Sequence, residues 1–294
     1  MEYIELIREF PLQLKGKKPD IVLPDFKEIL FCGMGGSGIV GTIAKDVLNE
    51  KVFVCKCYDI PKFVSQDTLV FCISYSGNTE ETLECAQQSI DKNAKVICVS
   101  SGGKLQEFAE ENNLYHIAVP KGFQPRAATG YLIAPILKLF GKEMPDIDLD
   151  LEKHAESIAK EIGEKMPVVY TNIQSVGLKW QQEINENSKM LCVTGIFPEL
   201  THNQINAFTQ KQNVHVILLN GDINEQNKKR FLFFEEQLKK QGISYSLIDL
   251  QGDKIKKILD GMILGSFVSY FLAVSRKKDP FNVEIIESLK KSLK

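Results

Sequence analysis

Two loops in the first third of the chain carry residue types that bind phosphate groups. Gly33-Met-Gly-Gly-Ser-Gly38 follows one apolar run, and Ser74-Tyr-Ser-Gly-Asn-Thr79 follows another. Glycines at a strand-to-helix turn expose backbone N–H groups, and a helix N-terminus favours negative charge. Hydroxyl groups add further donors, so together the two loops predict a site for one phosphate dianion. The residues expected to hold it are Gly35, Gly36, Ser37, Ser74, Ser76 and Thr79.

The glycine loop also has competing interpretations. It satisfies the pattern G-x-G-x-x-G, and Asp59 lies near the end of the next predicted strand, where a dinucleotide-binding fold places its ribose-binding acid. An NAD(P)-dependent dehydrogenase is therefore an alternative, and glycines needed only for a tight turn are another. The second loop favours a single phosphate, because a dinucleotide needs no group of hydroxyls after the third strand. Its own structural alternative is that Asn78 or Thr79 only caps the following helix.

Short β-rich apolar runs alternate with helical patterns from Glu28 onward, which predicts an α/β fold with parallel sheets covered by helices on both faces. In the first half, strands are expected at Ile29–Cys32, Val52–Cys55, Thr68–Ile73, Lys95–Val99 and Tyr115–Ala118, with helices at Ile39–Asn49, Glu80–Ile90, Lys104–Glu111 and Tyr131–Phe140. In the second half, strands are expected at Val168–Tyr170, Met190–Thr194, Val214–Leu219 and Ser244–Leu250, with helices at Val176–Glu186, Asn224–Lys239, Lys254–Ser275 and Asn282–Leu293. The stretch 141–150 is rich in acids, with Gly and Pro, and is expected to connect two domains, 1–145 and 146–294.

Composition excludes several classes of protein. The 294 residues carry 36 basic and 38 acidic side chains, a formal net charge of −2, which leaves no electrostatic footprint for nucleic acid. The N-terminus has acids where a secretory signal has a basic region, so a cytoplasmic location is expected. The apolar stretch Ile258–Val274 is interrupted by polar and glycine residues, which favours a buried helix over a membrane span.

Cysteine usage points to a reducing compartment. The chain has 7 cysteines, and most lie in apolar runs, where they are expected to act as small buried hydrophobic side chains. Cys55 and Cys57 form a C-x-C pair with too few neighbouring ligands along the sequence for a zinc site. No metal and no cofactor are therefore expected.

The two phosphate-binding loops resemble the SIS (sugar isomerase) domain. The nearest resemblance is to the bifunctional phosphoglucose/phosphomannose isomerase family of archaea and some bacteria. Three later segments also resemble that family: Gln124-Pro-Arg-Ala-Ala-Thr-Gly-Tyr131, Asn185-Glu-Asn-Ser-Lys189 and Phe197-Pro-Glu-Leu-Thr-His-Asn203. The resemblance implies two SIS-type domains, each a parallel sheet flanked by helices, the first with the phosphate loops and the second with catalytic residues. It also implies interconversion of glucose 6-phosphate or mannose 6-phosphate with fructose 6-phosphate.

The resemblance assigns roles for moving a proton between C1 and C2 through a cis-enediol, which needs a base, an acid and a cation near the oxyanion. Glu186 would be the base, and Arg126 would keep it ionised and stabilise the enediolate. His202 would protonate the ring oxygen, reaching the site from the other subunit of a homodimer. Lys290 would assist ring opening, with Lys291 as the alternative.

Two questions stay open at this point. Residues 279–294 contain no threonine, which the family associates with the mannose epimer, so turnover of both sugars does not follow from the resemblance. A phosphate site by itself does no chemistry. A non-catalytic SIS sensor of a sugar phosphate is therefore the second hypothesis.

Overall fold

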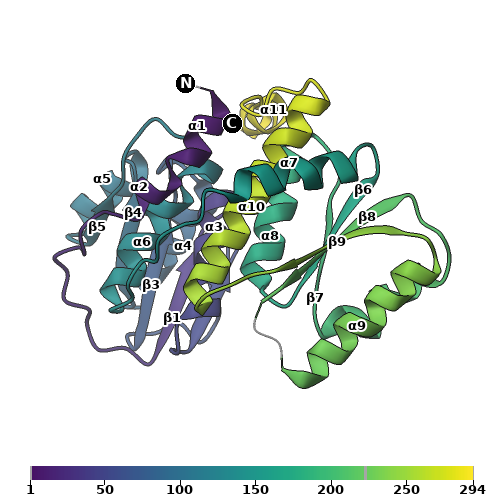
Figure 1. The fold of residues 1–294 in the computed structure, drawn as a ribbon. Helices are drawn as coiled ribbons and strands as arrows, with labels where there is room; N and C mark the ends of the chain where they lie inside the picture. Colours follow the sequence, from purple (N-terminus) through teal and green to yellow (C-terminus); the bar gives the residue numbers. More distant parts are fainter. Residues whose placement is uncertain (1, 222–223, 294) are drawn as a thin grey trace. The chain divides into compact units, whose positions relative to one another are not determined.

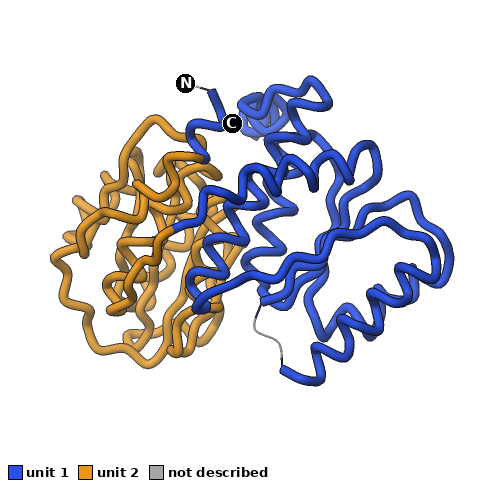
Figure 2. The backbone as a smooth tube through the Cα atoms, in the orientation of Figure 1, with its two compact units in different colours: residues 1–7, 147–294 blue, residues 8–146 orange. Residues whose placement is uncertain are grey.

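The computed structural model describes residues 2–221 and 224–293. The chain forms two compact units that divide after Asp146 (Figure 2). One unit comprises residues 8–146, and the other comprises residues 147–294 with the N-terminal residues up to Ile7. The domains expected from the sequence, 1–145 and 146–294, remain a prediction, and the structure adds that the start of the chain joins the C-terminal unit.

The unit of residues 8–146 is built on a five-stranded parallel sheet with the order β2-β1-β3-β4-β5 (Figure 1). Its helices pack on both faces: Gly41 of α3 lies against Phe31, whereas Cys85 of α4 packs with Leu30 and Cys32. The elements are β1 (Glu28–Cys32), β2 (Val52–Cys55), β3 (Thr68–Ile73), β4 (Lys95–Ser100), β5 (Tyr115–Ala118), α2 (Phe10–Gln13), α3 (Gly35–Val47), α4 (Glu80–Asp91), α5 (Lys104–Glu111), the 3₁₀ turn η1 (Pro125–Ala128) and α6 (Thr129–Leu139). The five expected strands are confirmed. Helix α3 begins at Gly35 rather than at the expected Ile39, because the glycine loop itself forms its first turn.

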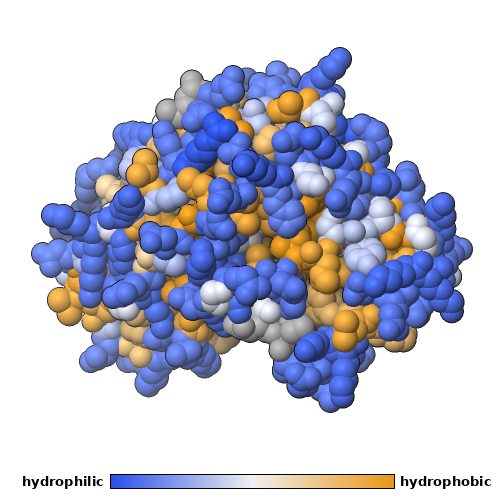
Figure 3. Space-filling view, viewed as in Figure 1, coloured by the Kyte–Doolittle hydropathy of each residue, from blue (hydrophilic) through white to orange (hydrophobic). Residues whose placement is uncertain are grey.

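The C-terminal unit has a four-stranded parallel sheet with the order β7-β6-β8-β9. Helices α7, α8 and α10 pack together, while aromatic side chains of α9 join the core formed by the strands. The elements are α1 (Tyr3–Arg8), α7 (Leu151–Ile162), β6 (Met166–Thr171), α8 (Gln174–Glu183), the π-helix η2 (Ile184–Ser188), β7 (Val193–Ile196), the 3₁₀ turns η3 (Glu199–His202) and η4 (Gln204–Thr209), β8 (Val214–Asn220), α9 (Glu225–Lys240), β9 (Ser244–Asp249), α10 (Lys254–Ser275) and α11 (Glu284–Ser292). Hydrophilic side chains cover most of the face in Figure 3, with apolar residues between them.

Helix α10 is long and apolar enough to cross a membrane by length and composition, since its best 18-residue stretch has a mean hydropathy of 1.7. The expected buried helix is confirmed, because 78% of that stretch lies inside the protein. Its polar interruptions also have local partners: Ser266 Oγ donates to Glu183 Oε2 at 2.5 Å, and Asp260 pairs with Lys256 at 2.7 Å.

His215 lies on β8, as the strand pattern predicts, and is only 1% exposed. Its two ring nitrogens lie 3.1 and 2.8 Å from the hydroxyls of Ser244 and Ser246. Burial lowers the pKa of His215 to about 4, against the opposing attraction of Glu161. The imidazole is therefore a neutral core group of the sheet.

Acid should destabilise the protein through His215. Because the pKa is lower in the folded state, the unfolded chain takes up the proton first, and stability falls as the pH drops from about 6.5 towards 4. The loss is on the order of 3 kcal/mol, from about 1.4 kcal/mol for each pKa unit. We expect His215→Gln to flatten the pH dependence of urea unfolding across this window, whereas His154→Gln, at an exposed position, should leave it unchanged. An equally steep dependence in both variants would contradict the assignment.

Candidate phosphate and catalytic site

The two loops predicted to bind phosphate meet at the carboxyl ends of the strands of the first sheet. They follow β1 and β3, which are neighbours in that sheet. The Tyr75 backbone N–H donates to Ser37 Oγ at 3.0 Å, and Ser74 Oγ shares a hydrogen bond of 2.8 Å with Thr79 Oγ1. Ser37 and Ser74 are buried, whereas Ser76 is exposed. The structure thus brings together Ser37, Ser74 and Thr79, and Ser76 lies on the same loop as the last two. We call these four residues the phosphate cage.

Strand order separates this site from a dinucleotide fold. From β1 the chain crosses to β2 on one side, and from β3 it crosses to β4 on the other, so the cage sits where the order reverses, the usual ligand crevice of such sheets. In a Rossmann sheet, β1 would lie between β2 and β4. The glycine pattern therefore occurs here in a different topology.

The capping alternative for the second loop is also disfavoured. Thr79 is the N-cap residue of α4, but its side chain makes no capping hydrogen bond. Asn78 instead accepts from the Lys104 backbone N–H at 3.2 Å and so ties the loop to α5. The first backbone N–H groups of a helix lack partners within it, so the start of α4 can add donors to the cage.

Arg126 lies directly against the glycine loop, although about ninety residues separate them along the chain. A Cβ atom on Gly36 would come within 2.9 Å of the Arg126 backbone nitrogen, so only glycine allows this approach. The arginine is 4% exposed and belongs to the 3₁₀ turn before α6. The structure thus places the Arg126 backbone beside the glycine loop, while its expected partnership with Glu186 remains a prediction.

Gly77 provides a direct test of the cage. Its φ is +72°, and an added Cβ would lie 1.7 Å from the Gly102 carbonyl oxygen. We expect Gly77→Ala to lower the free energy of unfolding by about 2–4 kcal/mol and to raise KM for a phosphorylated substrate, because the loop must move. Gly16→Ala is the matched control, since no atom lies within 4 Å of its added Cβ. Equal KM values for the two variants would argue against the cage.

Glu186 lies in the π-helix η2 rather than at the end of an α-helix. The expected helix Val176–Glu186 is therefore corrected: α8 ends at Glu183 and the wider turn Ile184–Ser188 follows. Asn187 Nδ2 donates to Ser269 Oγ at 2.8 Å, which holds this turn against α10. Short π-helical segments occur often at functional sites, because they redirect one or two side chains. The spacing of apolar residues gives no signal for such a turn.

The strand after this turn also starts later than expected. Asn185 Oδ1 accepts from the Cys192 backbone N–H at 2.9 Å, which keeps the segment before β7 out of the sheet. The predicted strand Met190–Thr194 is therefore shifted to Val193–Ile196.

A buried ion pair fixes α8 just before Glu186. Lys179 Nζ and Glu183 Oε1 lie 2.9 Å apart, and their side chains are 3% and 2% exposed. Trp180 between them donates to the Gly261 carbonyl oxygen at 2.7 Å. These contacts hold α8 against α10. The half-buried Glu186 comes three residues after Glu183, just beyond this fixed helix.

His202 and Glu186 lie at opposite ends of the strands of the second sheet: His202 near their carboxyl ends and Glu186 near their amino ends. His202 is exposed in the turn after the carboxyl end of β7. Helix α8 starts at the carboxyl end of β6 and returns beside it, so Glu186 lies near the amino edge. A six-residue strand is roughly 20 Å long. Because the two residues lie at opposite ends of such strands, their side chains are far apart within one chain.

Lys290 lies on the amphipathic helix α11, at the same side of this unit as Glu186. Lys189 connects the two segments, because its ammonium donates to the carbonyl oxygens of Glu186 and, at 2.7 Å, of Asn282, just before α11. Lys290 and Lys291 are both exposed. The structure does not favour one over the other.

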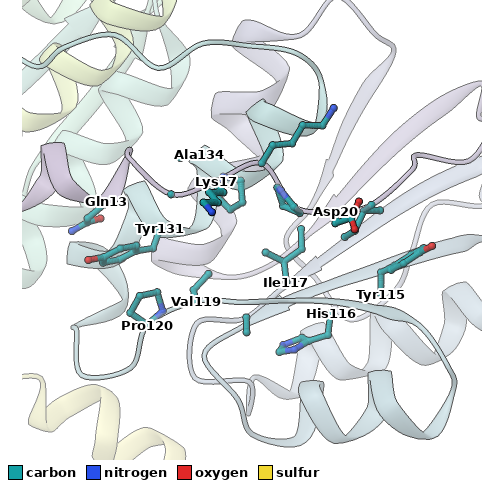
Figure 4. Close-up of a pocket in the computed structure, with 16 residues that line it drawn as sticks. Gln13, Lys17, Asp20, Tyr115, His116, Ile117, Val119, Pro120, Tyr131 and Ala134 are labelled. Carbon is teal, nitrogen blue, oxygen red and sulfur yellow. The ribbon is translucent and has the colours of Figure 1, made fainter.

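A cavity of about 570 Å³ elsewhere in the first unit lies between the segment around Lys17, strand β5 and helix α6 (Figure 4). Its lining includes His116, which shares a hydrogen bond of 2.8 Å with Ser100, and burial lowers the pKa of this histidine. The predicted site residues are absent from its described lining.

Comparison with known proteins connects both units to one family. An SIS domain matches residues 23–130, and "Bacterial phospho-glucose isomerase C-terminal SIS domain" matches residues 151–293. The bifunctional phosphoglucose/phosphomannose isomerase of Aquifex aeolicus is 37% identical over 92% of this chain and 92% of its own. The enzyme of that name from Thermoplasma acidophilum is 38% identical over 91% of this chain and 90% of its own. The chain belongs to the bifunctional phosphoglucose/phosphomannose isomerase family.

The family assignment confirms the predicted α/β architecture of two SIS domains. Among solved structures, tagatose-6-phosphate ketose/aldose isomerase from Escherichia coli has a TM-score of 0.72 at 12% identity, covering 95% of this chain and 94% of that one. At this identity the likeness shows the shared fold alone. Membership of the phosphoglucose/phosphomannose isomerase family rests on the curated relatives.

Proposed function

We propose that this chain is an aldose–ketose isomerase that interconverts glucose 6-phosphate, and also mannose 6-phosphate, with fructose 6-phosphate. The observation that carries the proposal is the phosphate cage at the strand-order reversal of an SIS domain, in a chain 37% identical to a relative named for both activities. The cage suits a monophosphate, because its hydroxyls and helix N-terminus converge on one small anion.

In the proposed mechanism, the cage holds the phosphate and so fixes the position of the sugar chain. Glu186 removes the proton from C2 of the open-chain aldose and returns it to C1, by way of the cis-enediol. His202 protonates the ring oxygen as the pyranose opens, since imidazole exchanges protons near neutral pH. Lys290 assists the opening, while Arg126 keeps Glu186 ionised and stabilises the enediolate oxygen.

We also propose a homodimer in which each site combines Glu186 of one subunit with His202 of the other. The support is the topology of the second unit, which puts the two residues at opposite ends of the strands of one sheet. The proposed location is the cytoplasm, where the sugar phosphates are substrates.

A coupled assay tests the proposed function. Purified protein is given glucose 6-phosphate or mannose 6-phosphate separately, with EDTA present, and fructose 6-phosphate is measured. Turnover of both sugars supports the proposal in full. Turnover of glucose 6-phosphate alone would indicate that mannose 6-phosphate requires the threonine that residues 279–294 lack. No turnover of either sugar would contradict it and favour the sensor hypothesis.

A further inference from the structure

A row of cysteines crosses the first sheet beneath the phosphate loops. In the strand register, Cys32 of β1 pairs with Cys55 of β2 on one side and with Cys72 of β3 on the other. Cys72 in turn pairs with Cys98 of β4. All four side chains point to the face that α4 covers, where Cys85 joins them. Spacing along the sequence gives no hint of this row, because the cysteines come from separate strands.

Three of these thiols, Cys32, Cys55 and Cys85, form a compact group at the β2 end of the row. Cys57, which follows β2, lies beside Cys55, and we call these four residues the thiol cluster. The sulfur atoms of Cys32, Cys55 and Cys85 all lie within 4.8 Å of one another. Cys55 Sγ lies 4.0 Å from Cys85 Sγ and 3.4 Å from Cys57 Sγ. In a tetrahedral zinc site with bonds of about 2.3 Å, neighbouring sulfurs are about 3.8 Å apart. The Cys55–Cys85 distance is slightly longer than that value, and the Cys55–Cys57 distance is slightly shorter.

The loop that carries Cys57 is held firmly over the cluster by α4. Gln88 accepts from the Ile60 backbone N–H at 3.1 Å and donates to the Tyr58 carbonyl oxygen at 3.2 Å. Cys85 Sγ also lies 3.2 Å from the Cys57 carbonyl oxygen. Cys57 is exposed while the other three are buried, so the cluster has one thiol at the surface through which an ion can enter.

We propose that the thiol cluster is a binding site for one thiophilic metal ion, Zn²⁺ or Cu⁺, with Cys32, Cys55 and Cys85 as buried ligands and Cys57 as the fourth. Soft thiolates select these ions over magnesium or calcium, and four sulfurs suit a closed structural site. Along the sequence, the pair Cys55 and Cys57 has too few neighbouring ligands for a metal site. The fold brings two further thiols, Cys32 and Cys85, to this pair. The ion takes no part in the proposed isomerisation.

Binding exchanges thiol protons for the metal. Each coordinating thiol releases its proton to solvent as its sulfur bonds to the ion, so no oxidant or reductant is needed and affinity rises with pH.

The cluster also lies close to the phosphate loops. Cys32 is followed directly by Gly33 of the glycine loop, and Cys85 is on α4, whose N-terminus completes the cage. A bound ion would fasten β1, β2 and α4 to one another just below the substrate phosphate. We therefore expect the ion to raise thermal stability.

Titration of reduced, metal-free protein tests the site without relying on enzyme activity. Zn²⁺ is added in competition with a chromophoric chelator, Cd²⁺ is added to observe thiolate-to-metal absorption in the ultraviolet, and Cu⁺ is added without oxygen. We expect one ion per chain, thiolate absorption, and a higher Tm. Tight binding in the Zn²⁺ or the Cu⁺ arm identifies the ion.

Variants assign the ligands. Cys55→Ala and Cys85→Ala should lose the ion, while Cys192→Ala, a buried cysteine of the other unit, should bind it as the unaltered protein does. Cys57→Ser changes an exposed residue and should keep the fold, with ~100-fold weaker binding, because one of four metal bonds is lost. If the unaltered protein binds neither ion more tightly than Cys55→Ala does, the proposal is overturned. Unchanged affinity in Cys57→Ser would overturn the assignment of the fourth ligand.

Discussion

Replacement of Glu186 by glutamine is expected to lower kcat by about 10²–10⁴-fold, the contribution of a positioned general base, with little change in KM. Glutamine keeps the size and hydrogen-bonding shape of the side chain but cannot accept the C2 proton. The phosphate cage lies in a different part of the chain and should bind substrate as before. The measurement is the coupled isomerase assay over a range of substrate concentrations, together with thermal unfolding.

Two glutamate variants separate chemistry from stability. Glu236→Gln changes an exposed residue of α9 and should leave both kcat and Tm unchanged. Glu183→Gln breaks the buried pair with Lys179 and should lower the free energy of unfolding by about 3–5 kcal/mol, because it leaves a buried charge without its counterion. The assigned base would be wrong if Glu186→Gln kept near-normal turnover.

Mixing two inactive variants is expected to restore activity. His202→Ala should be inactive on cyclic sugars, because nothing protonates the ring oxygen, and Glu186→Gln lacks the base. In a mixed dimer, one of the two sites combines an intact Glu186 with the partner's intact histidine. Random exchange of subunits makes half of the dimers mixed, so about a quarter of the normal activity should return.

The complementation experiment discriminates clearly between the two arrangements. If both residues of a site come from one chain, every site in the mixture lacks one of them and no activity returns. Exchange should be checked with differently tagged subunits, so that an absence of mixing is not mistaken for an absence of rescue. A mixture of His202→Ala with Lys211→Ala, at an exposed position with no proposed catalytic role, provides the control for dilution.

The sequence by itself determined the α/β architecture and the phosphate loops. Buried parallel strands are short continuous apolar runs, and the strands of the first half match these runs within a residue or two. The loops at Ser37 and Ser74 were predictable because phosphate binding needs glycine, hydroxyls and a helix start in local order. The family followed from those same local motifs.

Only the tertiary structure decided what depends on residues far apart in the chain. The approach of Arg126 to Gly36 comes from packing of η1 on α3, and the π-turn at Glu186 comes from contacts with α10. The thiol cluster exists because strand register aligns cysteines that the sequence scatters. Local patterns record the period of an element and the chemistry of a loop, but pairing between elements depends on the whole packed core, which no single segment encodes.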